Sequence, residues 1–290
     1  MNIENLFKKD RIGFSLEIFP PKKTGAIDGL YTTLEGLYKI HPDFISVTYG
    51  AGSGEASNKT AELASYIKNS LKIEPLAHLT CVNSTEEKLK QDIAKLYSKG
   101  VENILALRGD LDKDKQVSEQ FSHSSDLAKF IKNTNSNINV VGACYPEGHY
   151  EAKNIDEDID NLKYKLDNGV SHLITQLFFD NEKFYRFIDK VRNNGINVPI
   201  EAGIMPIVTT KQIERTVALS GASLPHEFTR IINRYSNNKE ALFHAGIAYS
   251  IEQIYELIEH GVDGIHLYTM NNATVATQVY NGIKTSLGRD

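Results

Sequence analysis

The sequence lacks the features that mark membrane-embedded, disulfide-rich and nucleic-acid-binding proteins. Among its 290 residues only Cys81 and Cys144 are cysteines, which argues against a disulfide framework. No apolar run approaches the ~20 residues that a membrane-spanning helix needs, and residues 1–11 are too polar for a secretory signal. The formal net charge of −5 provides no overall basic surface for nucleic acid. We therefore expect a cytoplasmic protein that binds neither membranes nor nucleic acid.

Several catalytic signatures are missing as well. There is no His-Glu-x-x-His pair and no Cys-His cluster, so we expect no metal site. The glycine-rich run at 50–54 matches neither the dinucleotide-binding fingerprint nor the phosphate-binding P-loop. The chain also has no Gly-x-Ser-x-Gly elbow, and the predicted strand ends present no lysine for a Schiff base. Nucleophilic catalysis by the protein itself is therefore poorly supported.

Short apolar stretches alternate with longer amphipathic stretches along the whole chain. The apolar stretches predict strands at 12–18, 44–48, 76–80, 104–107, 139–143, 172–178, 200–202 and 264–268. The amphipathic stretches predict helices at 27–39, 60–71, 85–99, 125–133, 155–168, 181–194, 210–220, 241–260 and 272–287. This alternation favours an α/β fold, a (β/α)₈ TIM barrel with extra helices, forming one catalytic domain over residues 1–290. The rival is an open doubly wound sheet, which usually carries a glycine-rich phosphate turn near its start.

The first predicted strand carries an acidic side chain. Two prolines at 20 and 21 end it, because proline cannot donate to a sheet ladder. Side chains alternate between the faces of a strand, so the apolar residues at 14, 16 and 18 share one face, whereas Ser15, Glu17 and Phe19 share the other. Glu17 is then a carboxyl group near the carboxyl end of an apolar strand. Burial there favours the neutral form of a carboxyl group, which a general acid needs near neutral pH.

Polar side chains also stand at the ends of the other predicted strands. In a barrel the carboxyl ends of all strands meet at one mouth, where the chemistry gathers. Glu17 is joined there by Thr48, His78, Arg108, Asp110, Gln176 and Tyr268. Such a mouth suits a large polar heterocyclic ligand with a phosphate tail and the donation of one proton. Two plainer interpretations stay open: Glu17 pairs with an interior cation, or His78 is only a hydrogen-bonded interior side chain.

Seven stretches, in the same order and across nearly the whole chain, resemble the methylenetetrahydrofolate reductase family. They are SLEIFPPK (15–22), FISVTYGA (44–51), AHLTC (77–81), LALRGD (105–110), ACYPEGH (143–149), ITQLFFD (174–180) and HLYTMN (266–271). The resemblance implies a barrel that binds FAD, takes electrons from NADH or NADPH, and reduces 5,10-methylenetetrahydrofolate to 5-methyltetrahydrofolate. This is a reaction of one-carbon metabolism and methionine supply. The length is similar to that of the bacterial form, which lacks the regulatory domain of the animal enzymes.

The resemblance also implies roles for individual residues. Glu17 would protonate the bridging folate nitrogen, and Asp110 would lie by the flavin, contact the pterin and lower the flavin potential. Gln176 would meet the nicotinamide cofactor and folate in turn, in ping-pong kinetics. Gln212 and Tyr268 would flank folate. The implied cofactor contacts are Thr48, Tyr49, Ala51, His78, Arg108, Gly109, Asp110, Tyr145, His149, Ala152, Asp158, Asn161 and Lys165.

Three positions depart from the family pattern. Asn272 stands where relatives carry an arginine for folate, and Tyr164 replaces a basic residue near FAD. Thr216 stands where some relatives place an aromatic residue against the adenine of the nicotinamide cofactor. We expect these departures to bear on folate affinity and on the choice between NADH and NADPH. A homo-oligomer is also expected, with a number of subunits that the sequence leaves open.

Other functions compete with this interpretation. One is another FAD-dependent barrel oxidoreductase, such as a relative of proline dehydrogenase, which would share only the fold. Another is a flavin-free lyase or aldolase in which Glu17 acts as a base. A third is a barrel that binds a ligand without catalysis. Flavin absorbance in the purified protein separates the first of these from the other two.

Overall fold

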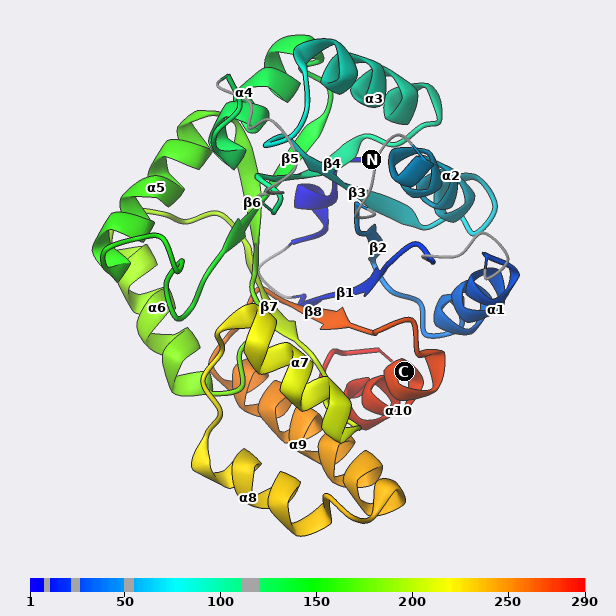
Figure 1. Cartoon of the computed structure of the whole chain (residues 1–290), viewed down its shortest axis with the longest axis vertical. Helices are drawn as coiled ribbons and strands as arrows, with labels where there is room; N and C mark the ends of the chain where they lie inside the picture. Colours follow the sequence, from blue (N-terminus) through cyan, green and yellow to red (C-terminus); the bar gives the residue numbers. More distant parts are fainter. Residues whose placement is uncertain (8–10, 22–26, 50–54, 111–119, 290) are drawn as a thin grey trace.

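Eight parallel strands form a closed barrel in chain order, and helices surround it (Figure 1). The computed structural model describes residues 1–7, 11–21, 27–49, 55–110 and 120–289. The strands are β1 (Gly13–Ile18), β2 (Phe44–Val47), β3 (Glu74–Thr80), β4 (Asn103–Leu107), β5 (Asn139–Cys144), β6 (Val170–Thr175), β7 (Ile200–Ile204) and β8 (Gly264–Tyr268). Pairing between β1 and β8 closes the sheet, which confirms the predicted (β/α)₈ barrel and excludes the open doubly wound sheet.

The helices follow the strands in the alternation that the sequence predicts. They are η1 (Ile3–Leu6), α1 (Ile27–Tyr38), α2 (Glu55–Asn69), α3 (Glu86–Ser98), α4 (Ser124–Thr134), α5 (Ile155–Asp167), α6 (Asn181–Asn193), α7 (Thr210–Ser220), α8 (His226–Tyr235), α9 (Lys239–Glu259) and α10 (Ala273–Ile283). The sequence reasoning missed α8, which lies against α9 at the edge of the molecule (Figure 1). Phe228 of α8 stacks on Phe179 with ring centroids 5.0 Å apart, so a tertiary contact holds this short helix.

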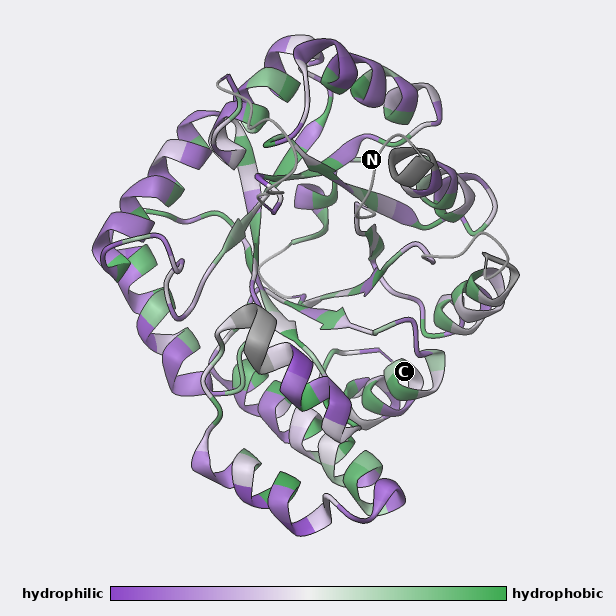
Figure 2. Ribbon diagram, viewed as in Figure 1, coloured by the Kyte–Doolittle hydropathy of each residue, from purple (hydrophilic) through white to green (hydrophobic). Residues whose placement is uncertain are grey.

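Alternation along the strands separates two interiors. Phe14, Leu16 and Ile18 of β1 are fully buried and belong to the main core between the barrel and its helices. A second apolar cluster, with Ile3 and Phe44 among its members, fills part of the barrel interior. Figure 2 shows the same division, with hydrophobic residues on the strands and on the inner faces of the helices. The inward-facing side chains of β1 therefore share the barrel interior with this second apolar cluster.

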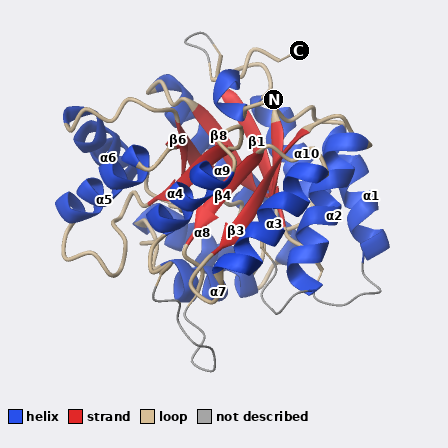
Figure 3. Cartoon of the chain, turned by 90° about the horizontal axis from the view of Figure 1, so that it is seen from above, coloured by secondary structure: helices blue, strands red, loops and turns tan. Residues whose placement is uncertain are grey.

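In the view turned by 90°, helices flank the strands, with α5 and α6 on one side and α1 and α2 on the other (Figure 3). None of the helices in the described ranges is both long enough and apolar enough to cross a bilayer.

β6 ends at Thr175, three residues before the predicted end at 178. The carbonyl oxygen Oε1 of Gln176 accepts a hydrogen bond of 2.9 Å from the Leu177 backbone, which marks the start of the loop.

Close packing of α9 against the loop after β7 supplies a stability prediction. A Cβ atom on Gly246 would lie 1.8 Å from the carbonyl oxygen of Ile207, which is backbone and cannot rotate away. We expect Gly246→Ala to lower the free energy of unfolding by about 1–3 kcal/mol or more, because α9 must shift. Urea unfolding followed by circular dichroism measures this. Gly29→Ala is the matched control, since a Cβ on Gly29 in α1 meets nothing within 4 Å. Equal destabilisation of both variants would contradict the packing argument.

Candidate active site

Glu17 lies at the carboxyl end of β1, beside two imidazole rings. Its Oε2 is 3.5 Å from Nε2 of His78 and 3.7 Å from Nε2 of His266. Its side chain is 18% exposed, so it reaches both the interior and the mouth. The sequence alternatives for Glu17 included an interior ion pair with Arg or Lys. Among the described residues no lysine or arginine pairs with Glu17, and its close titratable neighbours are these two histidines.

His78 is buried and hydrogen-bonded as well as close to Glu17. Its Nε2 lies 2.5 Å from Oγ of Ser46 on the neighbouring strand β2. Burial lowers the pKa of His78 to about 4, although the carboxylate of Glu17 partly opposes this. His78 is therefore neutral at pH 7. It satisfies the plain interpretation of an interior histidine and still adjoins the acidic group.

Tyr268 lies next to Glu17 on the strand that closes the barrel. The register of β1 and β8 pairs these two residues. The Tyr268 hydroxyl donates a hydrogen bond of 2.8 Å to the Thr175 carbonyl, and its ring meets His266 edge-on. Burial raises the pKa of Tyr268 well above its usual value, so the hydroxyl remains protonated. Tyr268 thus presents a ring and a fixed hydroxyl at the mouth.

The stretch after β4 carries a basic side chain followed by an acidic one. Arg108 forms an ion pair with Glu151 and donates a hydrogen bond of 2.8 Å to the Tyr150 hydroxyl. Gly109 has a φ of +87°, and a Cβ there would lie 2.9 Å from Thr80, so only glycine fits without strain. Asp110 is exposed, and its backbone carbonyl accepts a hydrogen bond from Asn83. The carboxylate of Asp110 is therefore open to a ligand.

A polar cluster lies between the end of β5 and α5. Lys165 donates a hydrogen bond of 2.9 Å to the Ala143 carbonyl and lies 5.9 Å from the ring centroid of Tyr145. Asp158 accepts a hydrogen bond of 3.0 Å from the His149 backbone. Burial lowers the pKa of Lys165 and raises that of Asp158, while each charge partly offsets the shift of the other. Asp158 is buried and Lys165 is half-buried, so neither lies on a fully solvated face of α5.

Other predicted cofactor contacts lie around this cluster or beside β2. The Ala152 backbone donates to the His149 carbonyl, whereas Asn161 is exposed on α5. Thr48 and Tyr49 are half-buried immediately after β2. Ala51 lies outside the described residues.

Two of the predicted folate contacts take part in local hydrogen bonds. Oε1 of Gln212 accepts from the backbones of Val208 and Thr209 at 2.9 and 3.0 Å, so it caps the start of α7. Gln176 lies just past β6, with its backbone bonded to the Cys144 carbonyl. These contacts hold both amides near the mouth in defined orientations.

The three departures from the family pattern also have places in the structure. Asn272 caps α10 by accepting a hydrogen bond of 3.1 Å from Val275. Tyr164 is 54% exposed on α5, and Thr216 is buried on α7. Asn272 therefore has a structural role that does not depend on folate.

Glu201 is a buried polar residue that the sequence reasoning missed. It is 0% exposed on β7, and its Oε2 lies 2.8 Å from Oγ of Ser15. The same Oγ lies 2.6 Å from Nδ1 of His266. Burial raises the pKa of Glu201 well above its usual value. Alternation along β7 would have revealed it, because Ile200, Ala202 and Ile204 face the helices as the apolar residues of β1 do.

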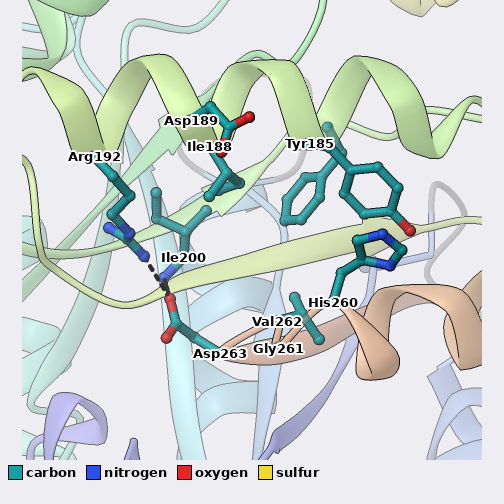
Figure 4. A pocket seen from close by; sticks show the side chains of 10 residues that line it. Tyr185, Ile188, Asp189, Arg192, Ile200, His260, Gly261, Val262 and Asp263 are labelled. Atoms are coloured by element: carbon teal, nitrogen blue, oxygen red, sulfur yellow. Dashed lines mark hydrogen bonds and ion pairs between the residues drawn. The ribbon is translucent and has the colours of Figure 1, made fainter.

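A cavity of about 270 Å³ lies at the opposite end of the barrel, between α6 and the turn before β8 (Figure 4). Figure 4 shows Arg192 paired with Asp263, at 2.8 Å. The ring of Tyr185 stacks on His260 with centroids 3.9 Å apart. These groups satisfy one another, which indicates a structural role. Elsewhere in the described ranges, no group of three or more His, Cys, Asp or Glu side chains can hold a metal ion.

Comparison with known proteins identifies the family. The family model described as "Methylenetetrahydrofolate reductase" matches residues 2–284. The chain belongs to the methylenetetrahydrofolate reductase family. It is 32% identical to the 5,10-methylenetetrahydrofolate reductase of Pectobacterium carotovorum subsp. carotovorum, over 96% of this chain and 93% of that protein. It is 33% identical to the Escherichia coli (strain K12) protein of that name, over 92% of this chain and 88% of the relative.

Plant and structural relatives extend the comparison. The chain is 34% identical to "Methylenetetrahydrofolate reductase (NADH) 1" of Arabidopsis thaliana, over 93% of this chain but 48% of that longer protein. Among solved structures, a Clostridium thermocellum protein described as binding two copies of 5-methyl-5,6,7,8-tetrahydrofolic acid superposes with a TM-score of 0.62 at 15% identity. That alignment covers 95% of this chain and 96% of the other. At this identity the likeness supports the fold alone. The family membership assigns the chain to the enzymes of folate metabolism and confirms the resemblance read from the sequence.

Proposed function

We propose that this member of the family is an FAD-dependent reductase that converts 5,10-methylenetetrahydrofolate to 5-methyltetrahydrofolate with electrons from NADH or NADPH. One observation carries the proposal beyond the family. Glu17 stands at the barrel mouth with its Oε2 next to two imidazoles, and its side chain is still partly exposed. This arrangement leaves Oε1 available to hand a proton to a substrate in the mouth. The plant relatives with NADH in their names support a nicotinamide electron donor.

The cluster at β5 and α5 fits an anionic cofactor with aromatic parts. The described contacts of Lys165 use one of its three donors, and its ammonium group is held close to the mouth by the Ala143 carbonyl. The rings of Tyr145 and His149 pack edge to face with centroids 4.7 Å apart, so they offer apolar surface beside that charge. Arg108, immediately after β4, adds a second cation. We propose that these residues hold the phosphates and the adenosine part of FAD.

The protein's contribution is to position groups and to move one proton. FAD, when bound, supplies the hydride chemistry, which belongs to the cofactor rather than to any side chain. Glu17 donates a proton to the bridging nitrogen of the folate substrate and so opens its five-membered ring. Gln176 and Thr48 contact the nicotinamide cofactor, and Gln176 and Gln212 contact folate. Because both substrates share the mouth, they bind in turn and the kinetics are ping-pong.

Asp110 supplies a prediction about the flavin potential. Its exposed carboxylate places a negative charge at the mouth, which opposes the build-up of negative charge on reduced flavin. We expect Asp110→Asn to raise the potential by a few tens of millivolts, since 1.4 kcal/mol corresponds to about 30 mV for a two-electron couple. Transfer to folate should slow accordingly. Spectroelectrochemical titration measures the potential, and an unchanged value would remove the electrostatic role.

Anaerobic half-reactions test the proposed function. Flavin absorbance in the purified protein should bleach on addition of NADH or NADPH and return when 5,10-methylenetetrahydrofolate is added. Bleaching without return would favour another flavin-dependent barrel oxidoreductase. Purified protein with no flavin absorbance, and no binding of added FAD, would favour the flavin-free lyase or the binding barrel. The family model spans residues 2–284, which supports one catalytic domain over residues 1–290.

A further inference from the structure

A chain of buried polar groups runs through the barrel interior to Glu17. It begins at Glu201 on β7, passes through Ser15 on β1, and reaches His266 on β8. The successive separations are 2.8 Å from Glu201 Oε2 to Ser15 Oγ and 2.6 Å from that Oγ to His266 Nδ1. From Nε2 of His266 to Oε2 of Glu17 the distance is 3.7 Å. The first two separations are hydrogen-bond distances, and the third is a close approach of the imidazole to the proposed general acid rather than a hydrogen bond.

We propose that Glu201 is a positioning residue that, through Ser15 and His266, directs an N–H group at one oxygen of Glu17. The proposal rests on the proposed function of Glu17 as a proton donor. His266 is then held with its hydrogen on Nε2. That hydrogen faces Oε2 of Glu17, so the acid proton of Glu17 stands on Oε1, the oxygen that is free to meet the substrate. The same N–H stabilises the carboxylate that remains after the proton has left.

The surroundings of Glu201 indicate in which direction the hydrogen bonds between Glu201, Ser15 and His266 are donated. The side chain is 0% exposed, and its described ion-pair partners are two histidines rather than a lysine or an arginine. A carboxyl group in that setting is neutral, because the charged form would lose its hydration without gaining a cation. Its Oε1 is buried without a hydrogen-bond partner among the described residues, whereas Oε2 has Ser15. The 2.8 Å contact between Ser15 Oγ and Glu201 Oε2 has Ser15 as donor when Glu201 is ionised; in the neutral form that we propose, the proton lies on Oε2 and is donated to Ser15 Oγ.

The Ser15 hydroxyl determines which nitrogen of His266 carries the hydrogen, because the hydroxyl has only one hydrogen to donate. Its oxygen accepts from Glu201, so its own hydrogen is donated to Nδ1 of His266, 2.6 Å away. A neutral imidazole that accepts at Nδ1 carries its hydrogen on Nε2. Nε2 of His266 has no hydrogen-bond partner among the described residues, and Glu17 is the carboxyl group that it faces. Hydrogen bonds aligned in one direction also strengthen one another.

Other titratable groups surround the two ends of the chain. Glu17 is faced by His78 on β3 and by Tyr268 on β8, both of which are neutral at pH 7. Glu201 is faced by His172 on β6, whose Nε2 lies 3.9 Å from Oε2, and burial lowers the pKa of His172 to about 3. More distant charges act on Glu201 from Asp43, Asp263 and Arg289. None of these groups interrupts the chain from Glu201 to Glu17.

The tautomer of His266 tests the proposal without any enzyme assay. Two-bond ¹H–¹⁵N correlation spectra of the protein labelled at histidine should show hydrogen on Nε2 of His266 at pH 7. The signals are assigned by their loss in His266→Asn. Wild-type protein with hydrogen on Nδ1 would overturn the proposal, since a lone pair would then face Glu17. The tautomer of His266 can be measured even if the protein reduces no folate. A negative result here is therefore distinct from failure of the proposed function.

Kinetics of the folate half-reaction provide the second test. Ser15→Ala and Glu201→Leu should slow that half-reaction about tenfold, a loss of roughly 1.4 kcal/mol, without slowing flavin reduction by NADH. Losing the N–H donor should also shift the pH profile of folate reduction, with the fall in rate beginning at a higher pH, because the carboxylate formed by proton transfer loses a hydrogen-bond donor. Glu201→Gln should restore the wild-type pH profile, because an amide N–H donates to Ser15 as the carboxyl group does.

His172→Phe is the matched control. It removes the other histidine beside Glu201, in a place already lined by Phe7 and Phe44, and leaves the chain to Glu17 intact. It should retain the wild-type tautomer and pH profile. A loss of rate in Ser15→Ala with an unshifted pH profile would indicate a merely structural role and overturn the proposal. Equal shifts in His172→Phe and Glu201→Leu would do the same.

Discussion

Glu17→Gln is expected to slow the reduction of 5,10-methylenetetrahydrofolate by about 10²–10⁴-fold, the contribution typical of a general acid. Gln has nearly the same shape as Glu but has no acidic proton, so the bridging nitrogen of the substrate leaves without protonation. Reduction of the proposed flavin by the proposed donor NADH requires no proton from this side chain and should remain largely intact. Stopped-flow absorbance under anaerobic conditions measures the two half-reactions separately.

The contrast between the half-reactions is the decisive feature of this experiment. Equal losses in both would point to a disturbed cofactor site and contradict the acid role. Glu35→Gln is the control, because Glu35 is an exposed carboxyl group on α1, away from the mouth. It should change neither half-reaction. Binding of folate to Glu17→Gln, measured by flavin quenching, confirms that the loss lies in the chemical step.

The stability of Glu201→Gln relative to wild type is expected to increase with pH. Burial raises the folded-state pKa of Glu201 well above that of the unfolded chain, which lies near 4.5. Below that value both states are protonated and Glu201 adds no pH dependence. Above it the unfolded state releases the proton while the folded state keeps it, so wild-type stability falls as pH rises toward the folded-state pKa. Between the two pKa values the slope is about 1.4 kcal/mol per pH unit for this one group.

Urea unfolding of both proteins at pH 5, 6 and 7 measures this effect. The difference between the two curves isolates Glu201, because His78 and His172 titrate equally in both proteins. The buried neutral histidines act with the opposite sign, since the unfolded chain binds protons below about pH 6.5 that the folded protein does not. Ile200→Val is the control, because it alters the same strand without a titrating group. A difference between Glu201→Gln and wild type that stays constant with pH would show that Glu201 is ionised in the folded protein.

The fold could be predicted because its signals are local. Alternation of apolar stretches with amphipathic ones sets the order of strands and helices, and each crossover helix forces parallel pairing. The polar residues at strand ends share one mouth for the same reason, so the sequence alone predicts that Glu17, His78 and Tyr268 lie together. The helix α8 escaped prediction because its main support is packing of Phe228 against Phe179, a contact that no local pattern shows.

The interior of the barrel was harder to predict than the mouth. Glu201 follows the same period-2 pattern as Glu17, but alternation says only that both side chains face inward. It does not say that β7 lies beside β8, or that β8 closes on β1 to bring Ser15, His266 and Glu201 together. Likewise, the amphipathic pattern along α5 does not show that Asp158 is 3% exposed, because that burial depends on the loop around His149, whose backbone donates to its carboxyl group.

The sequence by itself determined the barrel, the family and the identity of the polar groups at the mouth, because these depend on periodicity, chain order and matched motifs. Tertiary structure alone decided which of those groups are in contact and which are buried from solvent. Closure of the sheet between β1 and β8 brings residues 251 positions apart within 2.6 Å, at Ser15 and His266. Proton positions depend on such contacts and on burial, and both arise only when distant segments pack together.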